Sequence, residues 1–291
     1  MSNYFPETEL IITHKKTVYH IDLSQDQIAD DVIVVGDQGR VEKISAFFSK
    51  IECKVSHREF VTHTGIFNGK RITVLSTGIG TDNIDIVINE LDAAVNIDLD
   101  KRIEKTNKRS LNIIRLGTSG ALQDYIPVNS LVVSKYGLGL DGLLNFYDDY
   151  KQKNENEISS AFINHMNWPN NLCYPYCYSA NEKLFNLFAE GNHSGITATA
   201  PGFYGPQGRR LRLKPFMNDL NEKLTAFELN GNKITNFEME TSALYGLGKM
   251  LGHNCLTVCV IIANRVRKEF TNDYTSSVNK LIEASLERLT G

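Results

Sequence analysis

Arg115 stands where an apolar run ends and a loop of small residues begins. The local sequence reads Asn-Ile-Ile-Arg-Leu-Gly-Thr-Ser-Gly. A buried guanidinium without a partner is costly, so this side chain is expected to meet an anion. Gly117, Thr118, Ser119 and Gly120 follow it, and their backbone N–H groups and hydroxyls suit an oxyanion at the end of a strand. The segment therefore predicts a phosphate-binding turn.

A second turn of the same kind lies earlier in the chain. Two valines lead into the sequence Gly-Asp-Gln-Gly-Arg, which runs from Gly36 to Arg40. One glycine-rich turn with an arginine is common on protein surfaces and carries little weight alone. Two such turns, each after an expected strand, favour a shared site, because loops at the carboxyl ends of parallel strands line one crevice. Arg40 is therefore expected to reach the same anion as Arg115.

Alternating elements must position these two turns. Short β-branched runs alternate with amphipathic segments of helix length, which is typical of an α/β fold with helices on the faces of a sheet. Strands are expected at residues 31–35, 71–76, 111–116, 130–134, 195–200 and 255–262. Apolar helical faces are expected from Val41, Ile44, Phe47, Phe48 and Ile51, from Ile84, Val87, Ile88 and Leu91, and from Val278, Leu281, Ile282, Leu286 and Leu289. Residues 239–250 should also form a helix, with Glu240 in its first turns.

Composition limits the classes of protein to which the chain can belong. Its 291 residues are 42% hydrophobic and 22% charged, which is typical of a folded globular protein. With 31 basic residues against 34 acidic ones, the net charge of -3 indicates no nucleic-acid partner. We find no apolar run of 18 residues and no signal-peptide pattern, so we expect a cytoplasmic location and no membrane partner.

The cysteines predict neither a disulfide framework nor a metal site. Five scattered cysteines, an odd number, are typical of reduced thiols. Cys173 and Cys177 have no second Cys/His pair nearby at the spacing of a zinc site. We therefore expect no bound metal.

Several motifs resemble those of the nucleoside phosphorylase family in order and spacing. They are Gly36-Asp37-x-x-Arg40, Ser76-Thr77-Gly78-Ile79-Gly80, Arg115-x-Gly117-Thr118-x-Gly120 and Phe237-Glu238-Met239-Glu240. Residues 203–209, Phe-Tyr-Gly-Pro-Gln-Gly-Arg, are similar to the uracil-binding loop of the family's uridine phosphorylase branch. The resemblance runs from about residue 20 to residue 265. It implies one domain over residues 1–291, with an insertion at about 145–191, folded as an α/β/α sandwich around a mixed, partly barrel-like sheet.

The resemblance implies a pentosyltransferase that works by phosphorolysis. Phosphate would displace uracil from C1' of uridine, reversibly, to give ribose 1-phosphate, a reaction of pyrimidine salvage. Inorganic phosphate is then the co-substrate, and no metal or organic cofactor takes part. Three alternatives stay open: a purine or broader-specificity nucleoside phosphorylase, a hydrolytic nucleosidase that uses water, and a non-catalytic nucleoside-binding relative.

Phosphate-binding residues carry over from the motifs of the family. Guanidinium forks suit phosphate oxygens, and the phosphate ligands that the resemblance implies are Gly36, Arg40, Arg58, Arg115 and Thr118. Of these, Arg58 matches the arginine that the family donates to the neighbouring subunit's site, and His20 matches the neighbour's histidine near the ribose 5'-hydroxyl. The resemblance thus implies a homodimer as the minimal active unit and dimers assembled into a homohexamer.

The same resemblance implies which residues hold the nucleoside. Glu240 would accept hydrogen bonds from the ribose hydroxyls and stabilise positive charge on the sugar. Gln207 and Arg209 would hold uracil and stabilise its developing negative charge. The expected catalytic groups are therefore Arg115, Gln207, Arg209 and Glu240. The other expected substrate contacts are His20, Thr118, Ser119, Gly120, Phe203, Glu238, Met239, Ile261, Ile262 and Arg265. Glu238 has a competing role, because a carboxylate at a helix start often only complements the helix N-terminus.

Two departures from the wider family bear on specificity and ion binding. Purine-cleaving relatives carry an aspartate after the late strand, whereas residues 261–265 read Ile-Ile-Ala-Asn-Arg here, which favours the pyrimidine branch. Glu59 and Ile79 match the family's monovalent cation site, but Asn83 stands where a small hydroxyl residue is usual, so we assign no cation.

Overall fold

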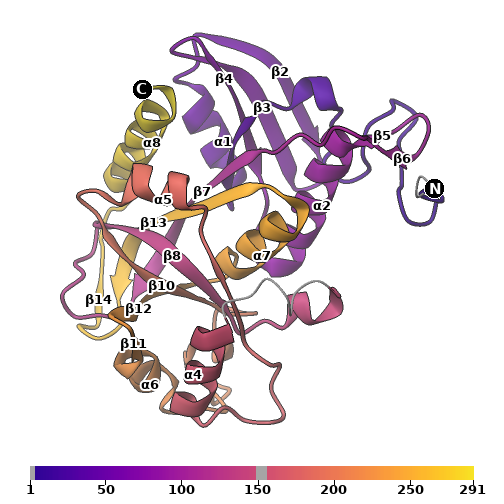
Figure 1. Ribbon diagram of the computed structural model, residues 1–291. Helices are drawn as coiled ribbons and strands as arrows, with labels where there is room; N and C mark the ends of the chain where they lie inside the picture. The colour runs from indigo at the N-terminus through magenta and orange to yellow at the C-terminus, as the bar shows by residue number, and fades with distance from the viewer. Residues whose placement is uncertain (1–3, 149–155) are drawn as a thin grey trace.

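A mixed sheet of twelve strands runs through the structure (Figure 1), a computed structural model that describes residues 4–148 and 156–291. Its strands are β1 (Asp31–Val35), β2 (Lys50–His57), β3 (Phe60–Phe67), β4 (Lys70–Ser76), β7 (Asn112–Ala121), β8 (Leu131–Gly139), β9 (Tyr176–Ser179), β10 (His193–Thr199), β11 (Glu228–Leu229), β12 (Asn232–Glu238), β13 (Asn254–Asn264) and β14 (Glu269–Phe270). They run in the order β11-β12-β10-β8-β13-β7-β1-β4-β3-β2, with β9 paired to β8 and β14 to β13. The short strands β5 (Ile97–Asp98) and β6 (Ile103–Glu104) pair with each other near the N-terminal segment (Figure 1).

One part of this sheet closes on itself. β12 pairs in the antiparallel sense with β7, where Asn236 lies opposite Ala121 and Phe237 lies opposite Gly120. This pairing joins β7, β13, β8, β10 and β12 into a barrel-like ring, while β1, β4, β3 and β2 continue from β7 as an open sheet. The expected mixed, partly barrel-like sheet is therefore confirmed.

Helices cover both faces of the sheet (Figure 1). The helices of the described residues are α1 (Gln38–Ser45), α2 (Thr81–Asn96), α4 (Asn156–Met166), α5 (Glu182–Ala189), α6 (Leu220–Ala226), α7 (Thr241–Leu251) and α8 (Thr275–Thr290). Successive side chains of a strand point to opposite faces. Accordingly Val32 and Val34 of β1 join the core cluster of α2 and α7, whereas Ile33 and Val35 join that of α1, α5 and α8. This alternation confirms the α/β/α sandwich, and α4 and α6 contribute to a third cluster with β12 of the ring.

The expected elements are largely present. All six predicted strands occur, as β1, β4, β7, β8, β10 and β13, and the apolar faces expected over residues 84–91 and 278–289 are buried in α2 and α8. The first helical face is wrong beyond Ile44, because α1 ends at Ser45 and Ile51 belongs to β2. Phe47 and Ile51 are 40% and 37% exposed. Antiparallel pairing of β2 with β3 holds this segment in the sheet, and that pairing depends on contacts that helical periodicity does not report.

The expected insertion at about 145–191 shares the main core. Its strand β9 pairs with β8, and Leu184 and Phe188 of α5 pack into the cluster of α1 and α8. Residues 149–155 of this segment lie outside the described residues. The described part of the segment is therefore packed on the sheet.

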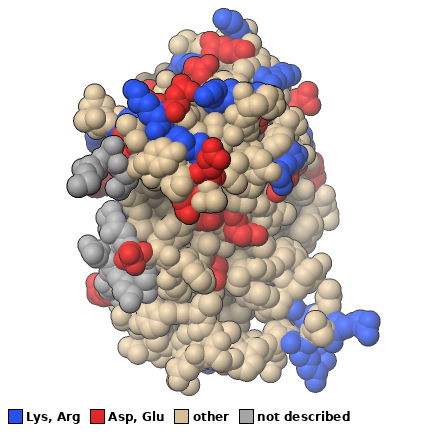
Figure 2. All heavy atoms as spheres, turned by 90° about the vertical axis from the view of Figure 1, so that its right-hand side faces the viewer, with Lys and Arg blue, Asp and Glu red and all other residues tan. Residues whose placement is uncertain are grey.

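The surface carries charges of both signs. Figure 2 shows basic and acidic side chains interleaved over the upper half of one face, as the near balance of 31 basic and 34 acidic residues leads one to expect. Of the helices that the structure describes, none is long and apolar enough to cross a bilayer.

Gly139, at the end of β8, has no room for a side chain. A Cβ atom there would lie 2.4 Å from the ring of Tyr176, which is buried and donates a hydrogen bond of 2.6 Å to Asp141. Gly139→Ala should therefore lower the free energy of unfolding by about 1–3 kcal/mol, the usual cost of overpacking a core. Urea denaturation followed by circular dichroism measures the change. Gly205→Ala is the matched control, because no atom lies within 4 Å of a Cβ at that position; equal losses in both variants would contradict close packing at Gly139.

Candidate active site

A cavity of about 970 Å³ opens where several strands end. Residues at or beyond the carboxyl ends of β1, β4, β7, β10, β12 and β13 line it. The predicted site residues that it brings together are Gly36, Arg40, Arg115, Thr118, Ser119, Gly120, Phe203, Gln207, Arg209, Glu238, Met239, Glu240, Ile262 and Arg265. Arg40, in the first turn of α1, and Arg115, inside β7, thus share one pocket. The loop predicted to begin after Arg115 is wrong, because β7 continues through residues 117–120 and ends at Ala121.

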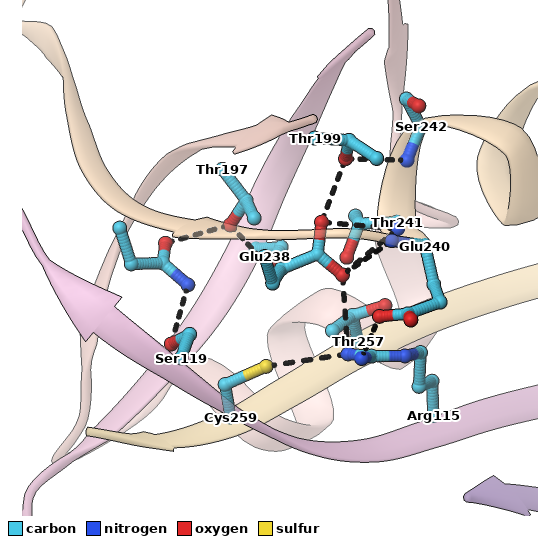
Figure 3. A network of polar contacts seen from close by, with 12 residues as sticks. Arg115, Ser119, Thr197, Thr199, Glu238, Glu240, Thr241, Ser242, Thr257 and Cys259 are labelled. Carbon is cyan, nitrogen blue, oxygen red and sulfur yellow. Dashed lines mark hydrogen bonds and ion pairs between the residues drawn. The ribbon is translucent and has the colours of Figure 1, made fainter. Parts of the chain in front are cut away.

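Arg115 is held by two carboxylates at the bottom of this pocket (Figure 3). Its Nη2 pairs with Glu240, and its Nη1 lies 3.2 Å from Glu238 Oε2 and 3.4 Å from Cys259 Sγ. The Arg115 side chain is only 5% exposed. Burial disfavours its charge, but the two carboxylates outweigh this and raise the pKa of Arg115 above its ordinary value. The anionic partner expected from the sequence is therefore present within the chain itself.

Gly117 gives the Arg115 side chain the space to fold back. A Cβ atom at this position would lie 2.3 Å from Nη1 of Arg115 and 2.8 Å from its Cζ. The sequence analysis expected this glycine to supply backbone contacts to an oxyanion. Its demonstrable effect is steric, because only glycine leaves the guanidinium room over the strand.

Arg40 is fixed from the other side of the pocket. Asp37 accepts the Gly39 N–H at 2.9 Å and begins α1, and Arg40 Nη1 donates to the Leu116 carbonyl at 2.9 Å. Burial lowers the pKa of Arg40, Asp37 opposes that shift, and the positive charge of Arg115 lowers the pKa further. The two guanidinium groups therefore repel each other across one pocket, and an anion between them would relieve that repulsion.

Glu240 and Glu238 lie at the start of α7 and have different hydrogen-bond partners. The expected helix over residues 239–250 begins at Thr241, with Glu240 as its N-cap residue. Glu240 Oε1 accepts the Gly80 N–H at 2.8 Å, and Oε2 pairs with Arg115. Glu240 thus holds together the turn after β4, the strand β7 and the start of α7.

Glu238 is surrounded by donors. Its oxygens accept the N–H of Glu240 at 3.0 Å, the N–H of Thr241 at 3.0 Å and the hydroxyl of Thr199 at 2.7 Å. Burial raises the pKa of Glu238, and the nearby Glu240 carboxylate adds to this effect while Arg115 opposes it. Glu238 lines the cavity, but these contacts are those of a helix-capping group that also holds Arg115.

The loop after β10 forms a positively charged wall. Arg209 stacks on Phe203, with Cζ 3.7 Å from the ring centre, and donates to Gln207 Oε1 at 2.5 Å. Arg265, from the end of β13, donates to the Gln207 carbonyl at 3.1 Å, and its buried Nη1 has no partner among the described residues. Burial and the charge of Arg265 lower the pKa of Arg209 to about 10. Both groups are therefore cations at neutral pH, and this side of the pocket suits a negative charge.

Three predicted residues are not brought to the cavity. Ile261 is fully buried in a small core cluster with Ala121, Ile126 and Val132, so only its neighbour Ile262 forms the expected apolar wall. Adjacent residues of a strand face opposite sides, which separates the two isoleucines.

His20 and Arg58 lie together elsewhere on the chain. His20 Nδ1 is 2.6 Å from Glu90 Oε1, and Arg58 donates to the Tyr19 hydroxyl at 3.0 Å with its Cζ 5.1 Å from the Tyr19 ring centre. The two predicted contacts are thus neighbours of each other and not of their own chain's cavity.

The sequence analysis missed some of the lining. Phe237 and Phe270 also contact the cavity, and Phe270 is 67% exposed. Phe270 reaches the site because β14 folds back along β13 and pairs with Ala263. Asn264 fixes that turn by accepting the N–H groups of Val266 and Arg267, and an asparagine before a short polar stretch was the available turn signal. Among the described residues no group of three or more His, Cys, Asp or Glu side chains could hold a metal ion.

Comparison with known proteins identifies the family. The model of the Phosphorylase superfamily matches residues 30–289. The uridine phosphorylase of Thermococcus kodakarensis is 32% identical over 272 residues, which is 93% of this chain and 86% of the relative, and that of Escherichia coli is 28% identical over 270 residues, 90% and 91%. A solved Trypanosoma brucei nucleoside phosphorylase, described as showing uridine phosphorylase activity, has 30% identity and a TM-score of 0.82, covering 96% of this chain and 99% of its own. The matched residues include every strand that lines the cavity, and the chain belongs to the Phosphorylase superfamily.

Proposed function

We propose that the protein is a uridine phosphorylase, which converts uridine and inorganic phosphate reversibly into uracil and ribose 1-phosphate. The observation that carries this proposal is one pocket lined by two pairs of arginines. Arg115 lies close enough to Arg40 to lower its pKa, and Arg265 lies close enough to Arg209 to do the same. Glu240, which also lines the pocket, connects the turn after β4 to β7. The activity of the relatives at 28–32% identity points to the same reaction.

Phosphate binds in the part of the pocket formed by Arg40 and Arg115. Gly36 and Thr118 line the same part of the cavity, and a phosphate oxygen held there is aimed at C1' of the sugar. Positioning of this kind accounts for much of the rate of a reaction between two bound substrates. The anion also reduces the repulsion between the guanidinium groups of Arg40 and Arg115.

Glu240 acts on the ribose. Its carboxylate accepts hydrogen bonds from the 2'- and 3'-hydroxyls and stabilises the positive charge that grows on the sugar as the bond from C1' to N1 lengthens. Met239 packs against the sugar, since it lines the cavity beside Glu240. Ser119 and Gly120, which also line the cavity, contact the nucleoside.

Gln207 and Arg209 act on the leaving base. The electron pair of the broken bond passes into the uracil ring, and the Arg209 guanidinium stabilises that negative charge while the Gln207 amide binds the edge of the base. Arg265 holds the Gln207 carbonyl and adds a second positive charge. Phe203 supplies an aromatic face and Ile262 an apolar wall.

Asn264 argues against a purine substrate. Purine cleavage benefits from an acid that protonates the base, whereas the Asn264 amide donates to the carbonyls of Gln123 and Ile126 and accepts two backbone N–H groups. It is committed to the turn after β13. A purine or broader-specificity nucleoside phosphorylase is the second candidate, since purine and pyrimidine enzymes share this fold family.

The complete site needs a second copy of the chain. Arg58 and His20 lie side by side outside their own cavity, as residues that serve a neighbour would. We therefore propose a homodimer as the minimal active unit and an assembly of dimers into a homohexamer. The proposed enzyme uses phosphate as co-substrate without a further cofactor and works in the cytoplasm.

Uracil release should depend on phosphate and on a pyrimidine base. We expect uridine, and not inosine or adenosine, to be cleaved in phosphate buffer, with ribose 1-phosphate formed in equal amount to free uracil. Chromatography of the products, with and without phosphate, measures this. Equal release without phosphate would identify a hydrolase, cleavage of inosine alone would identify a purine enzyme, and calorimetric binding of uridine without turnover would identify a non-catalytic relative.

Arg209→Ala and Arg115→Ala should change different kinetic constants. Arg209→Ala removes a group that stabilises the departing base, so kcat should fall by about 10²-fold or more while the KM for phosphate changes little. Arg115→Ala should mainly raise the KM for phosphate. Steady-state kinetics with each substrate varied distinguishes the two, and Arg210→Ala is the control for loss of a neighbouring charge because Arg210 does not line the cavity. An Arg209→Ala enzyme with unchanged kcat would remove Arg209 from the mechanism.

Two inactive variants should restore activity when mixed. Arg58→Ala damages the site of the neighbour, whereas Glu240→Ala damages the chain's own site. A mixed dimer keeps one complete site, so co-expressed and randomly paired chains should recover about a quarter of the wild-type activity. Assays of the co-purified mixture against each variant alone test this. No recovery, with mixed dimers present by native mass spectrometry, would contradict a shared site.

A further inference from the structure

The buried hydroxyl of Thr199 contacts Glu238, which is one of the two carboxylates that hold Arg115. β10 and β12 run parallel, and Thr199 of β10 lies directly opposite Glu238 of β12 in their register. The Thr199 side chain points from β10 toward the Glu238 carboxylate (Figure 3). Thr199 is fully buried and does not line the substrate cavity. It therefore cannot touch a substrate, yet it contacts a residue that holds Arg115.

The hydrogen-bond direction at Thr199 is fixed. Its Oγ1 accepts the N–H of Ser242, in the first turn of α7, at 3.0 Å. The single hydroxyl proton is then directed to Glu238 Oε1, 2.7 Å away. A hydroxyl held in this way is a preorganised donor to a carboxylate, and such charge-assisted bonds are among the stronger ones in proteins.

The two oxygens of Glu238 share the Thr241 N–H but differ in their side-chain partners. Oε1 is bound by Thr199, so Oε2 is the oxygen that faces Arg115 Nη1 at 3.2 Å and the Glu240 N–H at 3.0 Å. Without the hydroxyl, Oε1 would keep only the Thr241 N–H, at 3.2 Å, whereas Oε2 would keep Arg115 and the N–H groups of Glu240 and Thr241. Thr199 therefore helps to determine where the negative charge lies relative to Arg115.

The contact gains importance once a nucleoside is bound. In the unliganded chain Arg115 is held by Glu240 at Nη2 and by Glu238 at Nη1, and its Nε has no partner among the described residues. When Glu240 also accepts the ribose hydroxyls, as proposed, its carboxylate is shared between the sugar and Arg115, and Glu238 becomes the acid that contacts Arg115 and no substrate. A buried guanidinium with no fixed partner would not stay aimed at phosphate.

We propose that Thr199 is a positioning residue for phosphate use, which acts through Glu238 on Arg115. This inference rests on the proposed function, because it assigns phosphate to Arg115. It predicts that removal of one remote hydroxyl changes the use of phosphate and leaves the use of the nucleoside nearly intact.

Kinetics of Thr199→Val and Thr199→Ser test the proposal. Valine keeps the shape and removes the donor, so the KM for phosphate should rise on the order of 10-fold, whereas the KM for uridine should stay within about twofold. Serine keeps the donor and should restore the phosphate KM to near the wild-type value. Calorimetric titration with inorganic phosphate alone should show a loss of phosphate affinity in Thr199→Val that is smaller than the rise in its phosphate KM. Glu240 still holds Arg115 when no nucleoside is present.

Thr73→Val is the matched control for loss of a buried hydroxyl. Thr73 of β4 is equally buried, and its hydroxyl accepts the Ala29 N–H at 2.8 Å and bonds the Thr64 hydroxyl at 2.8 Å, away from the cavity. It should lower thermal stability without changing the phosphate KM. If Thr199→Val did not fold, Thr199→Cys, a weaker donor, should give an intermediate rise in phosphate KM.

The outcomes separate this inference from the proposed function. A wild-type enzyme that cleaves uridine only with phosphate, together with a Thr199→Val variant whose phosphate KM equals that of Thr73→Val, would overturn the role of Thr199 alone. Equal increases in the KM of both substrates, or no rescue by serine, would also overturn it, since they indicate a general packing defect. A wild-type protein that releases no uracil would instead overturn the proposed function.

Discussion

The buried ion cluster of Arg115 with Glu238 and Glu240 is the constraint on which the site depends. An arginine that is 5% exposed cannot stay charged at low cost unless its partners are placed to match it. Those partners come from the end of β12 and the start of α7, and they reach β7 only because β12 pairs with β7 and closes the ring. Closure of the barrel and assembly of the cluster thus depend on the same pairing, because without it Arg115 would lose both of its acidic partners.

The distribution of charge along the cavity follows from this cluster. Glu238 and Glu240 both pair with Arg115, whereas no acidic side chain in the described part of the chain forms an ion pair with Arg209 or Arg265. The part of the pocket proposed for phosphate therefore holds acids as well as arginines, whereas the part proposed for the leaving base is positive. Negative charge passes from nucleophile to leaving group during phosphorolysis, and fixed positive charge near the base stabilises the later part of that path.

Sequence reasoning reached the parts of this site that local pattern encodes. Arg40 follows β1 and Arg115 lies within β7, and these strands are parallel neighbours, so two apolar runs each leading to an arginine were sufficient to predict that the arginines meet. The turn expected after Arg115 was wrong, because residues 117–120 extend β7. Ring closure left no such signal, because β12 and β7 are distant in the sequence and their pairing depends on the whole fold. Ile261 and Ile262 illustrate a finer limit: the register of β13 against β7 shifts between Ile261 and Ala263, so simple alternation from the strand start does not say which isoleucine faces the cavity.

The two glutamates at the start of α7 show how structure divides roles that the sequence leaves equal. Both are carboxylates, two positions apart, beside the same helix, and both contact Arg115. Glu238 accepts hydrogen bonds from the N–H groups of Glu240 and Thr241 and from the hydroxyl of Thr199. It therefore supplies acceptors for N–H groups at the start of α7, which have no partner within the helix. Glu240 receives one backbone N–H, from Gly80, besides Arg115. Since a carboxylate has about four acceptor positions, Glu240 keeps free capacity for sugar hydroxyls and Glu238 does not, which supports the proposal that Glu240 binds the substrate and Glu238 holds Arg115.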